Sequence, residues 1–477
     1  MTRLEQEHQT YLRNRSGHWD ALADRPIGAL SRHYRQRLAD VYSHAVGSCE
    51  RILELGCGRG DLLAKLEPEL GVGVDLSNRM IDEARARYPS FQFHCADAQD
   101  CDLGDVTFDV IILSDLLNDL WDVQATLVHI RRYCHAGTRI VFNVQSHLWE
   151  YFRRLAEKRQ WVTPNLPQNW LTPTDMDNLV TLSGYELVQR WQEVLCPADI
   201  PLLATLLDRF LVKLPFFRIA ALTNFYVIRP LGLSPKPCMP SVSVVVPARN
   251  EAGHIGEILS RIPKMGSRTE VIFVEGNSSD NTFETIQQAL ADLPRDNYRL
   301  IRQPGKGKGD AVRAGFEIAT GDILMILDAD MTVPPEDLPR FYDILANDLG
   351  EFANGVRLVY PMQDRAMRFF NLLGNKFFSW AFSWLLGQAI RDTLCGTKVL
   401  WANDYRRIAD QRSDLGEFDP FGDFDLLFGA CRCHLKIMEI PIRYQARRYG
   451  ETNIRRWAHG WLLLRMVVFA ARLLKFK

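Results

Sequence analysis

The sequence predicts an α/β fold in two tandem domains, each built on a largely parallel sheet. Apolar runs of strand length alternate with helical patterns in both halves of the chain, which is typical of parallel sheets with crossover helices. A proline-rich segment, 232–240, separates the halves. The length of 477 residues also exceeds the roughly 100–200 residues of one ordinary domain.

The first domain is predicted over 1–231 and the second over 241–477, with 232–240 as the linker. In the first, strand patterns occur at 51–55, 71–74, 110–113 and 139–144, followed by a helix from 174 and a strand near 186–191. In the second, strand patterns occur at 242–246, 270–274, 298–301 and 323–327. Prolines at 230, 235, 237 and 240 are incompatible with a helix or central strand in the linker.

The composition is that of an ordinary globular protein. Hydrophobic residues make up 47% and charged residues 24%, and 57 Lys and Arg stand against 58 Asp and Glu, so we expect no nucleic-acid partner. One local bias lies at 443–477, where nine Lys and Arg against the single acid Glu451 leave a balance of +8. A basic segment of this kind is typical of contact with an anionic partner.

From the sequence we expect no signal peptide and no transmembrane helix. Residues 1–20 are polar, unlike a signal peptide, and no apolar run reaches the ~18 residues of a transmembrane helix. The ten cysteines form no CxxC pair and no zinc-site spacing, so we expect free thiols in a reducing compartment. The expected location is cytoplasmic, with peripheral attachment to the inner face of the membrane as a further hypothesis.

A glycine loop follows the first predicted strand. It contains Gly56, Gly58 and Gly60 after Glu54, and a helix is predicted from Asp61. Glycines let the backbone turn tightly and approach a ligand, and a helix N-terminus offers free N–H donors. A dinucleotide fingerprint needs glycine at the first, third and sixth places, and the sixth place here is Asp61. The spacing therefore differs from that of a dinucleotide site.

Two carboxylates follow the next strands of this half. Asp75 ends the strand at 71–74, and Asp97 follows the apolar stretch 91–96. An acid in the first position can accept both hydroxyls of a ribose, and one in the second suits the exocyclic amine of adenine. Either residue alone is better explained as a helix cap. The ordered set of glycine loop and two acids favours a nucleoside site.

Residues 51–143 resemble the class I methyltransferase family, which has a Rossmann-like fold. The residues that match its first motif are Glu54, Gly56, Gly58 and Gly60. Asp75 matches the ribose acid of the family and Asp97 its adenine acid. The resemblance implies S-adenosylmethionine as the cofactor and puts Asp115 in the cofactor pocket, near the methyl group. The methyl acceptor remains unassigned at this stage.

Polar loops also follow the first two strands of the second half. The first strand leads into Pro247, Arg249 and Glu251, and the second ends at Glu275. A carboxylate at the tip of a strand can accept an N–H of a nucleotide base. A simple turn capped by Asp280 explains the second loop better when that loop is considered alone.

The strand at 323–327 ends in Asp328-Ala329-Asp330. Two carboxylates one residue apart can share a divalent metal and, through the metal, a diphosphate. The motif by itself is common and weakly specific. Together with the other polar strand ends, it favours a site for a nucleoside diphosphate.

Residues 241–452 resemble family 2 glycosyltransferases of the GT-A fold, and most of all the polyprenyl-phosphate (dolichyl-phosphate) mannosyl- and glucosyltransferases. The matching segments are the metal motif at 328–336, the glycine-rich loop at 306–311, the acceptor-side turn at 395–398 and the terminal Arg-x-x-Gly-x-Ser-Lys at 447–453. Two positions depart from the pattern. Glu275-Gly276-Asn277-Ser278 replaces the usual Asp-Asp-Gly-Ser, which leaves the nucleotide base unassigned, and Asn453 replaces the final lysine.

The resemblance implies an inverting transfer from a nucleotide-diphosphate sugar, with Mg²⁺ or Mn²⁺ on Asp328 and Asp330. The residues expected around the nucleotide sugar are Pro247, Arg249, Glu251, Glu275, Lys308, Asp310 and Asp328. Those expected to face the acceptor are Lys398, Arg447 and Arg448. Asp328 is also expected to assist catalysis by contacting the ribose or a water on the metal.

Two kinds of sugar acceptor require different chemistry. A lipid phosphate is already anionic and needs cations, whereas a sugar hydroxyl needs a carboxylate base, for which Asp423 and Asp425 are the candidates. Helix capping explains those two acids equally well. The aromatic stretch 367–386 and the basic helix 457–477 are typical of a membrane surface, although core helices explain them almost as well. We expect a lipid phosphate at a membrane surface, with a soluble or lipid-linked glycan hydroxyl as the alternative.

Three functional hypotheses follow from the sequence. The first is a bifunctional enzyme with both transferase activities. The second is a glycosyltransferase whose N-terminal domain only senses S-adenosylmethionine. The third, an interaction scaffold with two inactive sites, is least favoured because both sites keep their charged residues.

Overall fold

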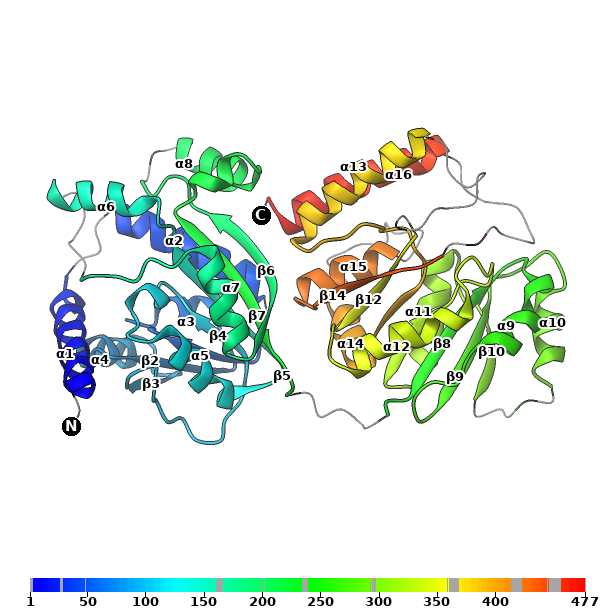
Figure 1. The fold of residues 1–477 in the computed structure, drawn as a ribbon, viewed down its shortest axis with the longest axis horizontal. Coiled ribbons are helices and arrows are strands. Elements are labelled where there is room, and N and C mark those ends of the chain that lie inside the picture. The colour runs from blue at the N-terminus through cyan, green and yellow to red at the C-terminus, as the bar shows by residue number, and fades with distance from the viewer. Residues whose placement is uncertain are drawn as a thin grey trace. The chain divides into compact units, whose positions relative to one another are not determined.

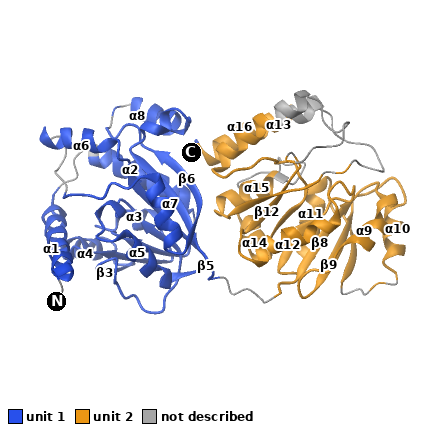
Figure 2. Ribbon diagram, in the orientation of Figure 1, with its two compact units in different colours: residues 1–234, 476–477 blue, residues 235–475 orange. Residues whose placement is uncertain are grey.

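The chain divides into two compact units, residues 1–234 with 476–477, and residues 235–475 (Figure 2). The structure is a computed structural model, and it describes residues 3–25, 29–47, 49–159, 166–198, 200, 202–233, 239–291, 293, 297–357, 359, 369–412, 423–443, 445 and 456–476. The predicted linker, 232–240, lies mostly outside the described residues.

The first unit is built on a seven-stranded sheet with the strand order β3-β2-β1-β4-β5-β7-β6 (Figure 1). Its strands are β1 Arg51–Leu55, β2 Leu70–Asp75, β3 Gln92–Cys95, β4 Phe108–Leu113, β5 Cys134–Gln145, β6 Tyr185–Glu193 and β7 Thr223–Pro230. Strands β1 to β5 are parallel to their neighbours, and β7 runs antiparallel to both β5 and β6. The carboxyl ends of β1 to β5 therefore meet at one edge of the sheet.

Helices cover both faces of this sheet. They are α1 Arg3–Ala23, α2 Ala29–Val46, α3 Asp61–Leu66, α4 Asn78–Arg87, α5 Val123–Ile130, α6 Trp149–Lys158, α7 Pro173–Leu182 and the short α8 Leu203–Thr205, which continues through further helical turns to Ala220. Neighbouring strand residues alternate between two apolar cores, with Leu53 in one and Ile52 in the other. Burial on both faces explains why these strands read as unbroken apolar runs.

The second unit contains another seven-stranded sheet, with the order β10-β9-β8-β11-β13-β12-β14. Its strands are β8 Val242–Ala248, β9 Thr269–Glu275, β10 Tyr298–Arg302, β11 Ile323–Ile326, β12 Phe352–Val356, β13 Lys398–Trp401 and β14 Ile437–Pro441. The four strands from β10 to β11 are parallel, while β13 runs antiparallel to both of its neighbours. The first four strands thus send their carboxyl ends to one edge.

The helices of the second unit again pack on both faces. They are α9 Ile255–Arg261, α10 Thr282–Ala289, α11 Lys308–Ile318, α12 Leu338–Ala346, α13 Phe369–Leu386, α14 Ala402–Asp410, α15 Asp423–Arg432 and α16 Arg456–Leu474. Helices α13 and α16 lie side by side (Figure 1). Within the described part of the chain, no helix has both the length and the apolar character needed to cross a membrane.

The predicted fold class, two α/β domains, is confirmed. Every strand predicted from the sequence is present, but β7, β12, β13 and β14 were not predicted. Strand β7 ends at Pro230, one of the prolines that suggested a break in structure. The pair Asn354-Gly355 lies inside β12, although this dipeptide is typical of a tight turn.

Candidate active sites

The glycine loop of the first unit joins β1 to α3. Gly60 has a φ of 77°, and a Cβ there would lie 2.8 Å from the ring of Phe93, so only glycine fits. The backbone N–H of Gly58 donates to Asp75 Oδ2 at 2.8 Å. Glu54 is buried and accepts from the N–H of Leu63 at 3.1 Å, and burial raises the pKa of its carboxyl. Glu54 therefore links β1 to α3 and stabilises the glycine loop between them.

Asp75 lies at the tip of β2, beside this loop. Its second oxygen accepts from the N–H of Ser77 at 2.9 Å, in addition to the bond from Gly58. Burial raises the pKa of the Asp75 carboxyl, while the two backbone N–H groups oppose that rise. The carboxylate is thus held in one orientation at the strand end.

Asp97 lies beyond β3, the next strand in the sheet. It accepts from the N–H of Gln99 at 3.1 Å, and His8 Nε2 lies 3.5 Å from its other oxygen. The ring of His8 stacks on Trp121, with ring centroids 5.4 Å apart. Asp97 therefore has the imidazole of His8 beside it, and His8 in turn stacks on Trp121; flat rings of this kind can stack on an adenine.

Helix α1 is the part of this site that the sequence did not predict. Its Asp20 accepts from Ser77 Oγ at 2.5 Å, and its buried Arg15 donates to Asp119 at 2.6 Å. The indole N–H of Trp19 also donates to Asp119, at 3.1 Å. These bonds fasten α1 across the strand ends that hold Asp75 and Asp97. The only signal in the sequence was a helical pattern with aromatic residues in an otherwise polar start.

Asp115 follows β4 in a left-handed conformation, with a φ of 52°. Its carboxylate accepts from Tyr34 Oη at 2.9 Å and from Asn143 Nδ2 at 2.6 Å. Its own N–H donates to Asn143 Oδ1 at 3.0 Å. Burial raises the pKa of Asp115, and the bonds from Asn143 and Tyr34 oppose that rise. A carboxylate constrained in this way points to a functional position.

The strand order explains how these groups fit S-adenosylmethionine. The strands run β3-β2-β1-β4 across the sheet, so the adenine acid, the ribose acid, the glycine loop and Asp115 follow one another along one edge. The adenine, ribose and methionine parts of the cofactor have the same order. The residues present therefore fit this cofactor.

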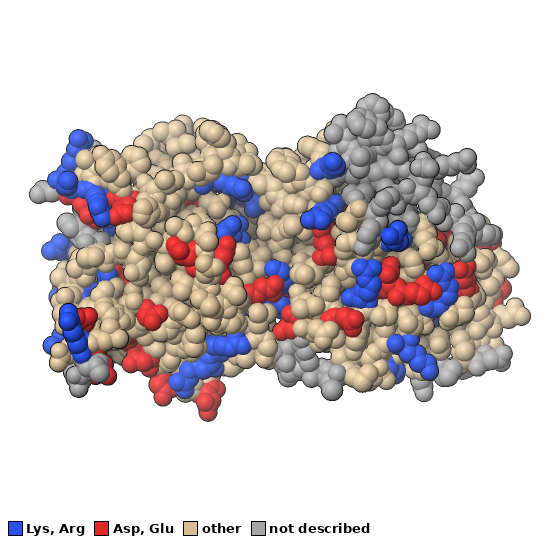
Figure 3. All heavy atoms as spheres, in the orientation of Figure 1, with Lys and Arg blue, Asp and Glu red and all other residues tan. Residues whose placement is uncertain are grey.

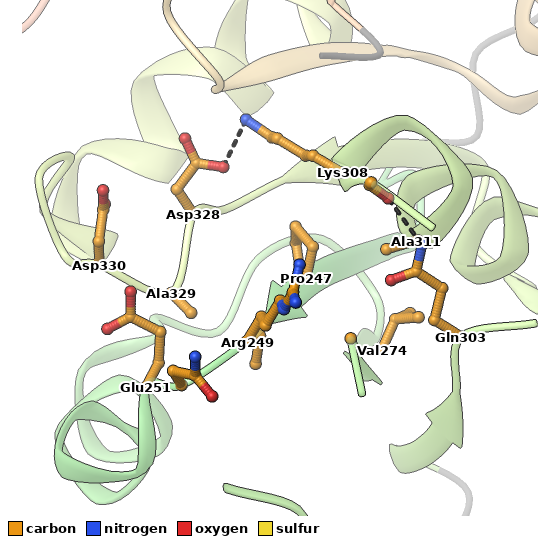
Figure 4. A pocket seen from close by; sticks show the side chains of 14 residues that line it. Pro247, Arg249, Glu251, Val274, Gln303, Lys308, Ala311, Asp328, Ala329 and Asp330 are labelled. Atoms are coloured by element: carbon orange, nitrogen blue, oxygen red, sulfur yellow. Dashed lines mark hydrogen bonds and ion pairs between the residues drawn. The ribbon is translucent and has the colours of Figure 1, made fainter. Parts of the chain in front are cut away.

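The second unit has a cavity of about 630 Å³ at the carboxyl edge of its parallel strands (Figure 4). The residues that line it are Pro247, Ala248, Arg249, Asn250, Glu251, Val274, Gly276, Gln303, Gly307, Lys308, Ala311, Asp328, Ala329 and Asp330. They come from the ends of β8, β9, β10 and β11 and from the start of α11. Among them are six of the residues that the sequence predicted: Pro247, Arg249, Glu251, Lys308, Asp328 and Asp330.

An ion pair joins two of these residues, Lys308 Nζ and Asp328 Oδ1, at 2.6 Å (Figure 4). Gly396 packs directly against both groups, and a Cβ at that position would overlap the Asp328 carboxylate and the Lys308 amine. The segment 395–398, which resembles an acceptor-side turn, therefore brings the backbone of Gly396 into direct contact with this ion pair.

Asp330 lies two residues further along the same loop. Its Oδ1 accepts from the N–H and the hydroxyl of Thr332, at 3.1 and 2.7 Å. Among the described residues, no group of three His, Cys, Asp or Glu side chains could hold a metal by itself. Mg²⁺ commonly binds one or two carboxylates together with substrate phosphates. Asp328 and Asp330 fit a metal of this shared kind.

Three further residues predicted to bind the nucleotide sugar are hydrogen-bonded within the loops of this site. Glu275 is buried and accepts from the N–H of Ser278 at 2.6 Å. Asp310 accepts from the N–H of Gly305 at 2.8 Å and so closes the glycine-rich loop. Neither residue is among those that line the cavity. Glu251, which does line it, is hydrogen-bonded to His254 at 2.9 Å.

Gln303 lines the cavity and was not predicted. Its N–H donates to the carbonyl of Glu275, and its side-chain amide donates to the carbonyl of Gly307 at 2.7 Å. The other end of this amide approaches Gly276, where a Cβ would lie 3.3 Å from Gln303 Oε1. Its position immediately after β10 was the available signal, because polar residues at parallel strand ends share one edge.

Comparison with known proteins assigns each half of the chain. Residues 52–137 match the model of a methyltransferase domain, and residues 243–396 match that of glycosyl transferase family 2. The chain thus contains a methyltransferase domain followed by a family 2 glycosyltransferase domain. We call the two compact units the methyltransferase unit and the glycosyltransferase unit.

Individual relatives resemble one unit or the other. The dolichol-phosphate mannosyltransferase of Pyrococcus furiosus is 34% identical over 222 residues, which cover 45% of this chain and 59% of that protein. The chain thus spans somewhat more than half the length of this relative. Glucosyl-3-phosphoglycerate synthase from Mycobacterium tuberculosis, solved with Mn²⁺ and uridine diphosphate, is 18% identical with a TM-score of 0.38, covering 50% of this chain and 81% of that one. An S-adenosylmethionine-dependent methyltransferase from Mesorhizobium loti is 23% identical with a TM-score of 0.31, covering 42% and 98%.

The remaining predicted residues of the glycosyltransferase unit concern its acceptor. Lys398 is fully buried in β13 and donates to the carbonyl of Cys395. Arg447 and Arg448 lie outside the described residues. Asp425 is buried in α15 and accepts from Arg412 Nε at 2.8 Å. Asp423 begins the same helix, but its side chain is outside the described set.

Proposed function

We propose that the protein transfers a sugar from a nucleotide-diphosphate donor to a polyprenyl-phosphate-type lipid, and a methyl group from S-adenosylmethionine to a second acceptor. The cavity of the glycosyltransferase unit carries the first part of the proposal. It combines a surface for a nucleoside with the two carboxylates and the lysine that a diphosphate would need. The 34% identity with a dolichol-phosphate mannosyltransferase supports the lipid class of the acceptor.

The nucleoside would lie over the ends of β8 and β9. Gly276 leaves space there, since a Cβ would come within 3.1 Å of Arg249 Cβ and 3.3 Å of Gln303 Oε1. Arg249 provides a planar cation on one side, and the amide of Gln303 offers hydrogen bonds on the other. Among the described residues that line the cavity, none from β9 is acidic. The nucleotide base would therefore be recognised by the Gln303 amide and by backbone groups.

The diphosphate would lie between Lys308 and the two aspartates. Mg²⁺ or Mn²⁺ on Asp328 and Asp330 would neutralise charge on the leaving nucleoside diphosphate when bound. Lys308 would donate to the phosphate oxygens, and Asp328 would hold the lysine amine in position through their 2.6 Å ion pair. Gly396, which has no side chain, would let the backbone at 396 lie directly against this pair.

A phosphate acceptor fits this arrangement without a catalytic base. One of its anionic oxygens would attack the anomeric carbon while the bond from that carbon to the diphosphate breaks, which inverts the carbon and transfers no proton. Asp425, a candidate base for a hydroxyl acceptor, instead accepts from Arg412 and is not among the lining residues. This observation favours the lipid phosphate over a glycan hydroxyl.

Helices α13 and α16 support work at a membrane surface. Each buries one side in the apolar core, through Phe382 on α13 and Met466 on α16. The other side exposes large apolar residues, including Trp380 (58% exposed) and Trp461 (63%). Exposed tryptophans on neighbouring helices are typical of contact with the lipid headgroup region.

The methyltransferase unit would bind the cofactor along the edge described above. Asp75 would accept from the ribose hydroxyls, Asp97 would lie against the adenine, and α1 would exclude water from both. S-adenosylmethionine supplies an electrophilic methyl group. Asp115, fixed by Tyr34 and Asn143, would orient the acceptor for in-line attack.

A screen of nucleotide sugars tests the proposal. Each sugar is incubated with the full chain and either a polyprenyl phosphate or soluble glycans, and the products are identified by mass. We expect a sugar-linked polyprenyl phosphate as the product, formed only when a divalent metal ion is present. A product formed only on glycan hydroxyls would replace the proposed acceptor, and full activity in excess EDTA would remove the metal from the proposal.

A further inference from the structure

The methyltransferase unit has an exposed apolar surface that belongs to neither site. The segment 200–220, which connects β6 to β7, exposes Leu202 (88%), Phe216 (81%) and Ile219. Helix α6 adds Tyr151 (72%) and Phe152. Single exposed apolar side chains are ordinary, but a concentration of this kind marks an interaction surface.

The two segments form one surface. The indole N–H of Trp149, at the start of α6, donates to the carbonyl of Ala220 at 2.9 Å. The backbone N–H of Ser146 donates to the carbonyl of Leu222 at 2.7 Å. In Figure 1, α6 and α8 also lie at the same end of the unit. We call residues 148–159 and 200–220 together the docking surface.

The docking surface borders the catalytic edge of the methyltransferase sheet. Gln145 at the end of β5 and Glu193 at the end of β6 both pair with Thr223, the first residue of β7. The segment 200–220 therefore leaves and re-enters the sheet at the edge where β4 ends and Asp115 follows. Arg153 of α6 donates to Gln145 Oε1 at 2.8 Å, which ties the helix to this edge.

The charges around the docking surface are complementary to an anionic bilayer. Its exposed cations are Lys158, Arg159 and Arg218, together with Arg154, which is paired with Glu150, and Arg209, which donates to the carbonyl of Phe476. Its described acids are less accessible: Glu150 and Glu157 are half-buried and ion-paired with arginines, and Asp208 is buried. Figure 3 shows Lys and Arg, with some Asp and Glu beside them, next to largely uncharged surface at this end of the unit. Exposed aromatic residues with a basic margin suit the interface of an anionic membrane.

We propose that the docking surface places the methyltransferase unit on an anionic lipid bilayer and that the methyl acceptor is itself membrane-bound. The second clause rests on the proposed methyltransferase activity. Because the surface adjoins the edge where the methyl group would be presented, a molecule held in the bilayer could reach Asp115 without leaving the membrane. A soluble acceptor would need no apolar surface at this edge.

Hydrogen exchange on the full chain tests the docking. Exchange is compared in buffer, with phosphatidylcholine vesicles, and with phosphatidylcholine–phosphatidylglycerol vesicles. We expect slower exchange in 200–220 and 149–158 with the mixed vesicles, and weaker protection at high salt. No change in these segments would overturn the proposal. Protection that rises with protein concentration in buffer would instead assign the surface to a second copy, and concentration-independent protection in buffer would assign it to another part of the chain.

Substitutions separate this surface from the helices of the glycosyltransferase unit. In the variant Leu202→Ser/Phe216→Ser/Ile219→Ser, vesicles should no longer slow hydrogen exchange in 200–220, while exchange in α16 should still be slowed. The affinity for vesicles should fall about tenfold, because one of two membrane contacts is lost. Leu182→Ser is the matched control, because Leu182 is 67% exposed and precedes β6 at the opposite edge of the sheet. An equal loss of affinity in the control would contradict the assignment.

The acceptor class has its own measurement. The full chain is incubated with methyl-labelled S-adenosylmethionine and vesicles containing a lipid extract of the source cells. We expect label in the organic phase and an at least tenfold smaller yield from the triple variant. No transfer to lipid by a protein that binds S-adenosylmethionine would overturn the membrane-bound acceptor. A protein that fails to bind the cofactor would instead contradict the proposed methyltransferase activity.

Discussion

The carboxylates of the two units are held in different ways. In the methyltransferase unit, Asp75 and Asp115 accept hydrogen bonds from neutral protein donors, and α1 is fastened across the strand ends. In the glycosyltransferase unit, Asp328 lies in a cavity and is paired with a cation, Lys308. The first arrangement is fixed before a ligand binds. In the second, the lysine paired with Asp328 would also donate to the proposed diphosphate.

We expect the largest loss of activity from a substitution in the glycosyltransferase site. Asp330→Ala removes a carboxylate expected to hold the metal, so the leaving diphosphate would lose its counter-charge. We expect glycosyl transfer to fall about a thousandfold, which corresponds to about 4 kcal/mol. Steady-state kinetics at saturating Mg²⁺ or Mn²⁺ measures the change. Asp343→Ala, on the exposed face of α12, is the control and should retain activity.

The contact of Gly396 with the ion pair gives a second test. In Gly396→Ala the new methyl group would displace Asp328 and Lys308, and a shift of that size can lower turnover about a hundredfold. Gly256→Ala is the control, because a Cβ at that position meets nothing within 4 Å. Equal activity of the two variants would show that the pair tolerates displacement. S-adenosylmethionine binding should be unchanged in both.

The methyltransferase site should respond more moderately. Asp75→Ala leaves the ribose hydroxyls without their acceptor and should weaken S-adenosylmethionine binding by roughly 1–3 kcal/mol. Calorimetry on the full chain measures it, with Asp82→Ala on the exposed side of α4 as the control. A wild-type protein that binds NAD and ignores S-adenosylmethionine would contradict the assigned cofactor.

The candidate base should matter least. Asp423→Asn should change transfer to a polyprenyl phosphate less than about threefold, because that acceptor has no proton to lose. With a sugar hydroxyl as the acceptor, loss of a base would cost about 10²–10⁴-fold. Parallel assays with the two acceptors decide between them, and a large defect on the hydroxyl acceptor would favour the glycan-extending alternative.

Separation of the units should have no effect on either ligand. Fragments 1–231 and 241–477 are predicted to fold independently, because each unit has its own apolar cores. Each fragment should melt cooperatively and bind its own ligand with the affinity of the full chain. Limited proteolysis that cuts outside 232–240, with fragments that do not melt cooperatively, would show the predicted boundary to be misplaced.

The two α/β halves and the polar strand ends could be predicted from local sequence patterns. Parallel strands buried on both faces must be continuous apolar runs, and their carboxyl ends must share an edge, so Asp75, Asp97, Asp328 and Asp330 could be assigned to edges from their positions alone. These signals are local, because a strand and the loop after it are adjacent in the chain.

The tertiary structure decided what depends on distant neighbours. The dipeptide Asn-Gly is typical of a turn, yet Asn354 and Gly355 lie in β12, where Asn354 donates to the carbonyl of Asp392 at 2.8 Å and Gly355 packs against Cys395. Lys398 was predicted to face the acceptor, and the structure buries it in β13. The position of α1 over the methyltransferase edge likewise depends on bonds such as Arg15 to Asp119, about a hundred residues apart. Burial and long-range hydrogen bonds decide these positions, and no periodic pattern in the sequence encodes them.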